Sequence, residues 1–478
     1  MKRLIPLALA ALLAVATAPV PAATAAPSSL SQSQTQELVE SYAHLTGDFY
    51  KKVDRQAALD GARTSIIELL KKRKVANPAL PQLRAADDDV TNAEELSREV
   101  STAISTYAPK LETVDAQSPA TQITYAAIAG VLGSVKDRYT VFLSPKEYAA
   151  LNDNLDGTSF GGVGISYEID DKTQFLHVQN VIIDGPSDKA GLAADDLITA
   201  IDGIPVPTLL GPAITAQKDP EKRLSAEQEL ITKALRGNPG TRVRLAVRRG
   251  ANNLEPVTVT RAEIHAPSVL AKMLPGDIGY VELAVFGQTT AQELNTALKH
   301  LDGKGARAYV LDLRRNGGGY LNAAVDVASK FISTGPIVSV QSRAGTDTEY
   351  DAENTAISPR PLAVLVDQYT ASASEITAGA IQDSGVGTLV GTKTFGKGVV
   401  QTIFPMRDGS AVKITTARYF TPKGRDINSI GIQPDIESVM PKDTTNIRFR
   451  DPGSDPQMIA AIRFLNAKLG FAGNSSPQ

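Results

Sequence analysis

Residues 361–383 read PLAVLVDQYTASASEITAGAIQD, the pattern of a buried strand, a short turn and a helix in succession. The apolar run ends at Asp367 and the helical run opens near Ser374, so Ser372 falls in the turn. Ligands of open α/β sheets bind at such carboxyl ends of strands, and the first amides of a helix carry partial positive charge. We therefore expect the Ser372 hydroxyl and the Ala373 amide to face a binding site at the edge of a sheet.

Two serines of this turn compete for the role of nucleophile. Ser374 has the better position for a helix cap, because the acidic Glu375 follows it in the first turn. We assign the chemistry to Ser372 and the cap to Ser374. A helix start rich in serine and alanine also forms without any chemistry, so this turn alone does not decide the function.

A second strand, loop and helix of the same layout is ARAYVLDLRRNGGGYLNAAVDVASKFI (306–332). The glycines from Gly317 to Gly319 let backbone amides approach a ligand closely. We choose Gly318 as the second amide, besides that of Ala373, that could stabilise an oxyanion. Strand-like and helical runs alternate through this half of the chain, which indicates an α/β core over 263–440.

The glycine-rich run GTKTFGKG (391–398) allows two interpretations. It nearly matches a phosphate-binding loop, but Gly398 replaces the magnesium-binding hydroxyl residue, and VVQTIFPM after it has the pattern of a strand. In the other interpretation Lys397 is a base: a buried ammonium loses hydration, its pKa falls, and the neutral amine can take the proton of a serine. We prefer this second interpretation, in which Ser372 and Lys397 act as nucleophile and base without histidine.

Gln401 lies on the same strand face as Lys397 by two-residue alternation. A strand rises ~3.3 Å per residue, so the two Cα atoms would stand ~13 Å apart in a straight strand. We expect the chain to bend at Gly398 if Gln401 is to contact the lysine.

The amino-acid composition excludes several kinds of catalysis and binding. The 478 residues include 42% apolar residues, no cysteine and four histidines, and the formal net charge is −3. The absence of cysteine excludes thiol catalysis and disulfides. The Lys and Arg residues are dispersed and do not form the basic patch that binding to nucleic acid requires. We expect neither a cofactor nor a metal. No histidine is near Ser372 in the sequence, so a histidine base would have to be a distant one, His265 or His300.

The first residues, MKRLIPLALAALLAVATAPVPAATAAPSS, begin with a basic pair, continue with an apolar run and end in small residues. This is the pattern of a secretory signal peptide (1–25) with cleavage after Ala25 or Ala26, and it predicts a periplasmic or secreted protein. An uncleaved membrane anchor is the alternative, which Pro6, Pro19 and Pro21 disfavour.

The rest of the chain divides by the period of its apolar residues. Spacings of three and four predict a helical N-terminal region over 26–156, interrupted by a polar loop at 76–95. Short alternating runs separated by Gly, Pro and Asp predict a β-rich module over 157–262. A last amphipathic helix and a frayed tail are expected over 441–478.

Five ordered motifs together resemble the carboxyl-terminal processing peptidases, S41-type proteases with a Ser-Lys dyad. Four lie in the α/β core: DLRRNGGG, ASASEITAGA, TFGKGVVQ and YFTPKGRDINSIGIQPD (419–435). The fifth, GGVGI followed by DGPSDKAGLAADDLITAIDG, resembles their PDZ domain. The resemblance covers about 115–470 and implies a crotonase-like α/β protease core with a PDZ domain and a helical N-terminal region.

The resemblance also implies roles for single residues. Ser372 would be the nucleophile and Lys397 the general base, and Gln401 would orient that lysine. The oxyanion amides would be those of Gly318 and Ala373. The loop that caps the terminal carboxylate of a bound peptide, which adds a strand to the PDZ domain, would consist of Gly162, Val163, Gly164 and Ile165.

Some positions depart from the family pattern. Gly317 and Arg315 replace the usual proline and asparagine, and 211–229 is an extra segment. Asp383 matches an acidic position of the family. We interpret it as structural, because a carboxylate would favour the charged form of a lysine base.

The sequence thus predicts an extracytoplasmic serine endopeptidase whose PDZ domain binds protein or peptide substrates with free, apolar C-termini. The alternative is a non-catalytic PDZ scaffold or chaperone that keeps the protease fold. Retention of both Ser372 and Lys397 disfavours it. Homo-oligomers and adaptors stay open as further partners.

Overall fold

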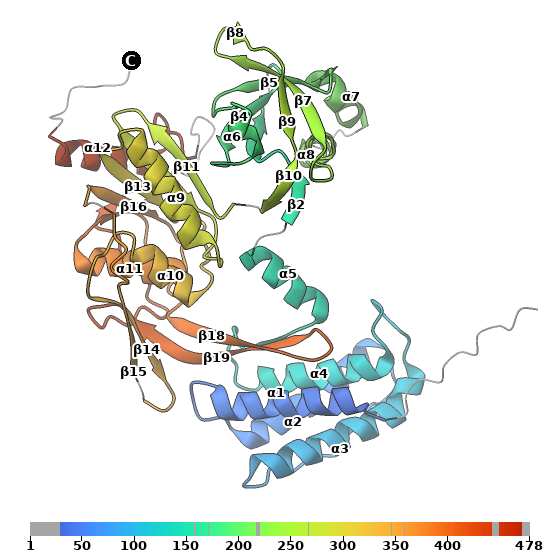
Figure 1. Cartoon of the computed structure of the whole chain (residues 1–478). Coiled ribbons are helices and arrows are strands. Elements are labelled where there is room, and N and C mark those ends of the chain that lie inside the picture. The colour runs from blue at the N-terminus through green and yellow to red at the C-terminus, as the bar shows by residue number, and fades with distance from the viewer. Residues whose placement is uncertain are drawn as a thin grey trace, which may run out of the picture. The chain divides into compact units, whose positions relative to one another are not determined.

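The computed structural model describes residues 29–156, 159–170, 172–216, 220–265, 267–345, 347–357, 359–441 and 449–470 (Figure 1). The chain divides into two compact units: residues up to 42 with 55–134, and residues 43–54 with all those from 135 onward. The predicted signal peptide and the tail after residue 470 lie outside the described residues. Among the described residues, no helix has both the length and the apolar character needed to cross a bilayer.

The first unit is built of helices. It contains α2 (Arg55–Lys72), α3 (Asp89–Tyr107), η1 (Ala108–Lys110), α4 (Pro119–Gly133) and the first part of α1 (Gln32–Asp48). Helices α2 and α4 cross where each has a glycine. A Cβ added to Gly61 would lie 2.3 Å from the carbonyl oxygen of Gly130, and one added to Gly130 would lie 2.2 Å from that of Gly61. Only glycine permits so close an approach.

The loop predicted over 76–95 is shorter than expected, because α3 already begins at Asp89. Asp88 caps this helix, and its carboxylate accepts a hydrogen bond from the Thr91 amide at 2.8 Å. Asp89 pairs with Arg55 of α2 at 2.7 Å. The acidic run that looked like loop is thus a helix start, where negative charge is favourable.

The second unit contains the predicted α/β core. Its central sheet has the order β11-β12-β13-β16-β17-β20, in which only the β11 to β12 pairing is antiparallel. These strands are β11 (Val269–Leu274), β12 (Ile278–Leu283), β13 (Ala308–Asp312), β16 (Leu362–Val366), β17 (Thr388–Gly391) and β20 (Ile436–Glu437). β13 and β16 are buried throughout, as parallel strands with both faces covered should be.

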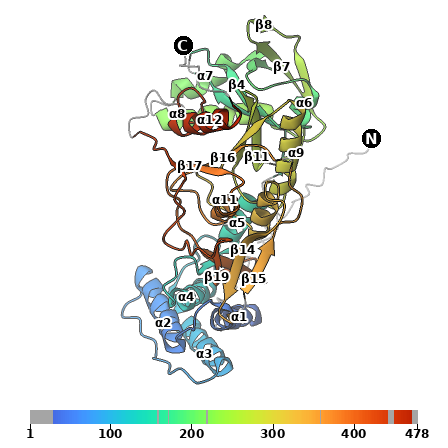
Figure 2. The same ribbon diagram turned by 90° about the vertical axis from the view of Figure 1, so that its left-hand side faces the viewer.

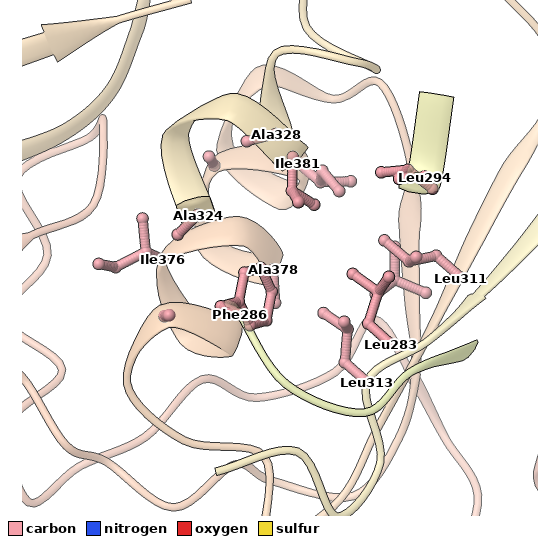
Figure 3. Close-up of a cluster of buried hydrophobic side chains, with 14 of the residues drawn as sticks. Leu283, Phe286, Leu294, Leu311, Leu313, Ala324, Ala328, Ile376, Ala378 and Ile381 are labelled. Carbon is pink, nitrogen blue, oxygen red and sulfur yellow. The ribbon is translucent and has the colours of Figure 1, made fainter. Parts of the chain in front are cut away.

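Helices cover both faces of this sheet (Figure 1). α9 (Thr290–Gly303), α10 (Leu321–Ala328) and α11 (Ala373–Ser384) pack on one face, and α12 (Pro456–Lys468) packs on the other. Figure 3 shows the larger core, where Leu283 and Leu311 of the sheet cluster with Leu294 of α9 and Ile381 of α11. The predicted α/β class is confirmed.

A smaller sheet has the order β1-β19-β14-β15, with β18 also paired to β19. Its strands are β1 (Val141–Leu143), β14 (Pro336–Ser342), β15 (Asp347–Asp351), β18 (Val399–Pro405) and β19 (Ala411–Phe420), of which Figure 2 shows β14, β15 and β19 together. Helix α5 (Pro145–Asp156) follows β1. Because β18 follows the run 391–398, this run lacks the helix that a phosphate-binding loop requires.

The β-rich module has its own sheet of order β3-β4-β5-β7-β8, onto which β6 and β9 pair, and a separate β2 to β10 pair. The strands are β2 (Ser159–Gly162), β3 (Ile165–Ile169), β4 (Leu176–Val181), β5 (Leu197–Ile201), β6 (Ile204–Pro205), β7 (Arg242–Arg249), β8 (Asn252–Asn253), β9 (Val257–Thr260) and β10 (Ala262–His265). The helices are α6 (Pro186–Lys189), α7 (Val206–Ala216) and α8 (Pro220–Leu235). The described residues of the extra segment 211–229 belong to α7 and α8.

Candidate active site

Four loops meet at one edge of the central sheet, because β12, β13, β16 and β17 are parallel and end there. Backbone hydrogen bonds of 3.0 Å join these loops: Phe286 N to Gly318 O, Ala371 N to Asn316 O, and Phe395 N to Thr370 O. The parallel register therefore brings together residues that are distant in the sequence.

Ser372 occupies the turn between β16 and α11. Its φ of 58° and ψ of −120° are strained for a residue with a Cβ atom. Helix α11 begins at Ala373, so Ser372 itself takes the N-cap position, and the assignment of the cap to Ser374 is wrong. The turn closes earlier because the Glu375 side chain accepts from Ser372 N at 3.0 Å, while the buried Ser374 hydroxyl donates to the carbonyl oxygen of Asn316.

The Ala373 amide is the first of α11, and the first amides of a helix have no acceptor within that helix. Gly318 packs directly against it: an added Cβ would lie 2.8 Å from Ala373 N and 2.8 Å from the Cβ of Ser372. The Gly318 amide donates to Oδ1 of the buried Asn316 at 2.9 Å. The two amides predicted for an oxyanion are therefore neighbours, and one of them has an internal partner in this structure.

A buried ion network holds the strand end from which the glycine loop starts. The fully buried Arg314 pairs with Asp312 and Asp455 at 2.7 Å each. Asp455 is the N-cap of α12 and accepts from the amides of Gln457 and Met458. The network thus connects the C-terminal helix to the loop that contains Gly318.

Lys397 lies in the loop between β17 and β18. Burial of the ammonium, followed by the positive charge of Lys413 on β19, lowers the pKa of Lys397 to about 8. Its Nζ lies 4.9 Å from the centre of the Tyr139 ring. A lysine with this pKa is partly neutral at mildly alkaline pH and can accept a proton.

Gln401 lies on β18, next to a register irregularity between Val400 and Gln401. Its Nε2 is 3.4 Å from both Val399 O and Thr415 Oγ1, and the Thr415 hydroxyl donates to Asp137 Oδ2 at 2.5 Å. The predicted contact with Lys397 is not formed between these two described side chains. The amide group of Gln401 is oriented by β19 instead.

One cavity of 340 Å³ collects every residue predicted for the chemistry: Ser372, Ala373, Gly318, Lys397 and Gln401. Apolar side chains form much of the remaining wall: Leu151, Leu155, Leu321, Ile376, Val400 and Ile403. Within the described part of the chain, the side chains of Ser372 and Lys397 share this cavity without a hydrogen bond between them. The arrangement can hold an extended chain segment against a hydroxyl, an amine and two amides.

Two other candidates lie away from this cavity. Asp383, near the end of α11, accepts from Arg425 Nη2 at 2.5 Å and from Lys423 N at 3.0 Å, which supports its structural interpretation. His300 lies on α9 and does not line the cavity. In the described residues, no group of three or more metal-binding side chains is placed to hold a metal ion.

The β-rich module has a cavity of 150 Å³ at the predicted carboxylate loop. Gly162, Val163, Gly164 and Ile165 line one side, and Thr232 and Leu235 of α8 line the other. Gly164 has a φ of +77°, a backbone conformation that favours glycine. The groove between β3 and α8 leaves an edge to which an extended peptide can add as a strand.

Sequence reasoning missed Glu375 and Tyr419 as parts of the site. From the sequence, Glu375 was considered only as an acidic residue in the first turn of a helix. Tyr419 was considered only as the first residue of the motif at 419–435. For Glu375 a signal existed, since a glutamate three residues after a turn serine forms a capping box. For Tyr419 none existed, because a tyrosine in a strand is usually a core residue.

Residues 277–438 match peptidase family S41, and residues 161–260 match the PDZ domain. The chain is 35% identical to a carboxyl-terminal-processing protease of Synechocystis sp. over 358 residues, 74% of this chain and 79% of that protein. The chain is a member of peptidase family S41.

Other similarities are of the same kind. A chloroplastic C-terminal processing peptidase of Tetradesmus obliquus is 37% identical over 341 residues, which are 70% of this S41 peptidase and 72% of that protein. A solved structure of a photosystem II D1 C-terminal processing protease aligns with a TM-score of 0.43 and 28% identity, over 86% of this chain and 96% of that chain. This S41 peptidase is therefore a serine-type protease of the carboxyl-terminal processing group with a PDZ domain.

Proposed function

We propose that this peptidase cleaves proteins near apolar C-termini with Ser372 as nucleophile and Lys397 as general base. The observation that carries the proposal is the shared cavity, in which a hydroxyl on a strained turn stands with a lysine whose pKa is lowered to about 8. No histidine is required for this pair.

In the first half of the reaction, the Ser372 oxygen attacks the carbonyl carbon of the scissile peptide bond while its proton passes to the neutral amine of Lys397. The resulting ammonium returns this proton to the nitrogen of the leaving chain, the C–N bond breaks, and an acyl group stays on Ser372. A water molecule then attacks the acyl carbon while Lys397 takes its proton, the ester bond to Ser372 breaks, and the lysine ammonium returns the proton to the serine oxygen. The products are a shortened chain with a new carboxylate and a free amine on the released segment.

The amides of Ala373 and Gly318 are proposed to stabilise the oxyanion of each tetrahedral intermediate. Ala373 supports this role by its place at the start of α11. The Gly318 amide would have to exchange the side-chain oxygen of Asn316 for the substrate oxygen. Gln401 lines the same cavity as Lys397, and to orient the lysine its side-chain carbonyl would have to form a contact that this structure does not contain.

Substrate recognition is assigned to the PDZ domain. The backbone of Gly162, Val163, Gly164 and Ile165 lines a groove that an extended peptide could fill, with its terminal carboxylate at the loop. The apolar walls of the active-site cavity support a preference for apolar residues near the cleaved bond.

We place the enzyme outside the cytoplasm, in the periplasm or secreted. The support is the signal-like pattern of residues 1–25.

The decisive test compares Ser372→Ala with Ser374→Ala on an unfolded protein substrate, using purified proteins of matched thermal stability. Ser372→Ala should abolish cleavage because the attacking oxygen is gone. Ser374→Ala should keep measurable cleavage, because it removes only one buried hydrogen bond, worth ~1 kcal/mol. Activity in Ser372→Ala, or complete loss in both variants, would contradict the proposal.

A further inference from the structure

The backbones of Ser372 and Lys397 are held by the same two side chains. The amides of both residues donate to one oxygen, Oε2 of Glu375, at 3.0 and 2.8 Å. The carbonyl oxygens of both residues lie 3.1 and 2.6 Å from one hydroxyl, that of Tyr419. The sequence separates the serine from the lysine by a helix and a strand. These shared partners join the two loops at the reacting residues themselves, in addition to the backbone hydrogen bond from Phe395 N to Thr370 O.

Glu375 is the side chain that accepts from the amides of Ser372 and Lys397. Its side chain is fully buried, and its second oxygen, Oε1, accepts from Gly396 N at 2.7 Å and from Thr394 Oγ1 at 2.5 Å. A buried carboxylate is costly unless donors surround it, and here four donors do. The carboxylate is thus committed to the backbone of both loops.

Tyr419 of β19 forms the carbonyl side. It is 1% exposed, and burial raises its pKa well above the ordinary value, so its hydroxyl keeps its proton. A phenol has one proton to donate, and both neighbours are acceptors. The shorter distance makes the Lys397 carbonyl the main acceptor, and the Ser372 carbonyl shares the proton more weakly.

We propose that Tyr419 is a positioning residue that, with Glu375, sets the distance between the Ser372 oxygen and the Lys397 amine. The inference rests on the proposed roles of that serine and lysine. Without the Tyr419 hydroxyl, the Lys397 carbonyl loses its hydrogen bond, and Lys397 can shift relative to the serine turn while the bonds at Phe395 and Gly398 remain. A displacement of ~1 Å at a reacting group can cost ~100-fold in rate.

The same loosening would admit water to the lysine and raise its pKa. The charged and titratable groups that face Lys397 are Lys413, Glu375, Arg138 and Asp137, with the Tyr139 ring beside them. None of these groups is removed by changing Tyr419 to phenylalanine. A change in the pH profile would therefore report the position and hydration of Lys397.

The test is Tyr419→Phe in the full chain, which keeps the buried ring and removes only the hydroxyl. We expect kcat to fall ~10- to 100-fold with KM within about twofold, and the midpoint of the pH profile to move above the wild-type value. Tyr309→Phe is the matched control. Tyr309 is 2% exposed in the same core, on β13, and its hydroxyl donates to Asp302, away from the cavity.

The control should lose stability like Tyr419→Phe but keep the wild-type kcat and pH midpoint. If Tyr419→Phe has the wild-type kcat and the wild-type midpoint of the pH profile, the proposed positioning role of Tyr419 is refuted. Equal loss of activity in both variants would refute it as well. Should Tyr419→Phe not fold, Glu375→Gln tests the amide side, since its NH₂ group cannot accept from backbone amides, and the same fall in kcat is expected. Its pH midpoint is not compared, because the loss of the Glu375 charge by itself lowers the pKa of Lys397. Activity in Ser372→Ala would instead overturn the proposed function, whatever the Tyr419 result.

Discussion

At the scale of the residue, the protonation state of Lys397 should determine how activity depends on pH. Burial and Lys413 lower its pKa to about 8, so the neutral amine needed for catalysis accumulates as the pH rises through that value. Activity should therefore increase from pH 7 to 9. Lys397→Arg should be as inactive as Lys397→Ala, at least ~100-fold below wild type, because a guanidinium stays protonated.

An active arginine variant would show that the position supplies only positive charge. Lys413→Met is a further check on the pH profile. It removes the second cause of the lowered pKa of Lys397, so the activity profile should move to higher pH.

Lys397→Met should raise the thermal stability at pH 7, where the folded protein carries a buried charge, and this gain should shrink as the pH rises above about 8.

Single residues differ in how far the sequence predicts them. Ser372, Ala373 and Lys397 could be located because a turn before a helix and a glycine-flanked lysine are local patterns. The hydrogen-bond partner of Gly318 could not be predicted, since whether Asn316 or a substrate accepts from its amide depends on the fold of a loop. The same holds for Gln401, whose amide contacts Thr415 on the neighbouring strand.

At the scale of the element, the crossing of α2 and α4 depends on the absence of two side chains. Gly61→Ala should destabilise the helical unit by ~1–3 kcal/mol, although alanine favours helix, because its Cβ would lie 2.3 Å from the Gly130 carbonyl oxygen. Gly133→Ala, in the last turn of α4 with no atom within 4 Å of its added Cβ, should be neutral or slightly stabilising. Thermal unfolding followed by circular dichroism checks both, and equal effects would show that helix propensity dominates.

Element boundaries follow from local chemistry where the chemistry is recognised. Strand β18 was predicted from the alternation of its apolar residues. The start of α3 was misplaced because three successive aspartates are typical of a loop, whereas here one of them caps the helix. The start of α11 was misplaced for a related reason. The Glu375 side chain closes the turn at Ser372, two residues before the serine chosen as cap.

At the scale of the whole molecule, the PDZ groove should make cleavage depend on the substrate's C-terminus. A substrate with an apolar, free C-terminus should be cleaved faster than the same chain ending in an amide or in aspartate. Deleting 157–262 should abolish this preference, whether it lowers or raises total activity. Equal rates for free-acid and amidated substrates with the intact enzyme would refute recognition of the C-terminus and leave the Ser372 chemistry untouched.

The order of modules along the chain was predictable from changes in period, and the α/β class followed from it. The buried pairing of Arg314 with Asp455 was not, because its partners are distant in sequence and charged residues are normally exposed. The network lies under the loop of Gly318, so the geometry of the site depends on a helix near the end of the chain.

The path of the chain between the two units has a practical consequence for dissecting the protein. Residues 43–54 belong to the unit of the α/β core, where His44 stacks on Phe404 at 3.8 Å and Tyr50 N donates to Thr415 O at 3.0 Å. The chain therefore passes from one unit to the other after residues 42, 54 and 134. A truncated protein that starts at residue 135 would leave the Phe404 ring uncovered and the Thr415 carbonyl without its donor. Such a fragment would need residues 43–54 back, as a separate peptide or joined at a new terminus.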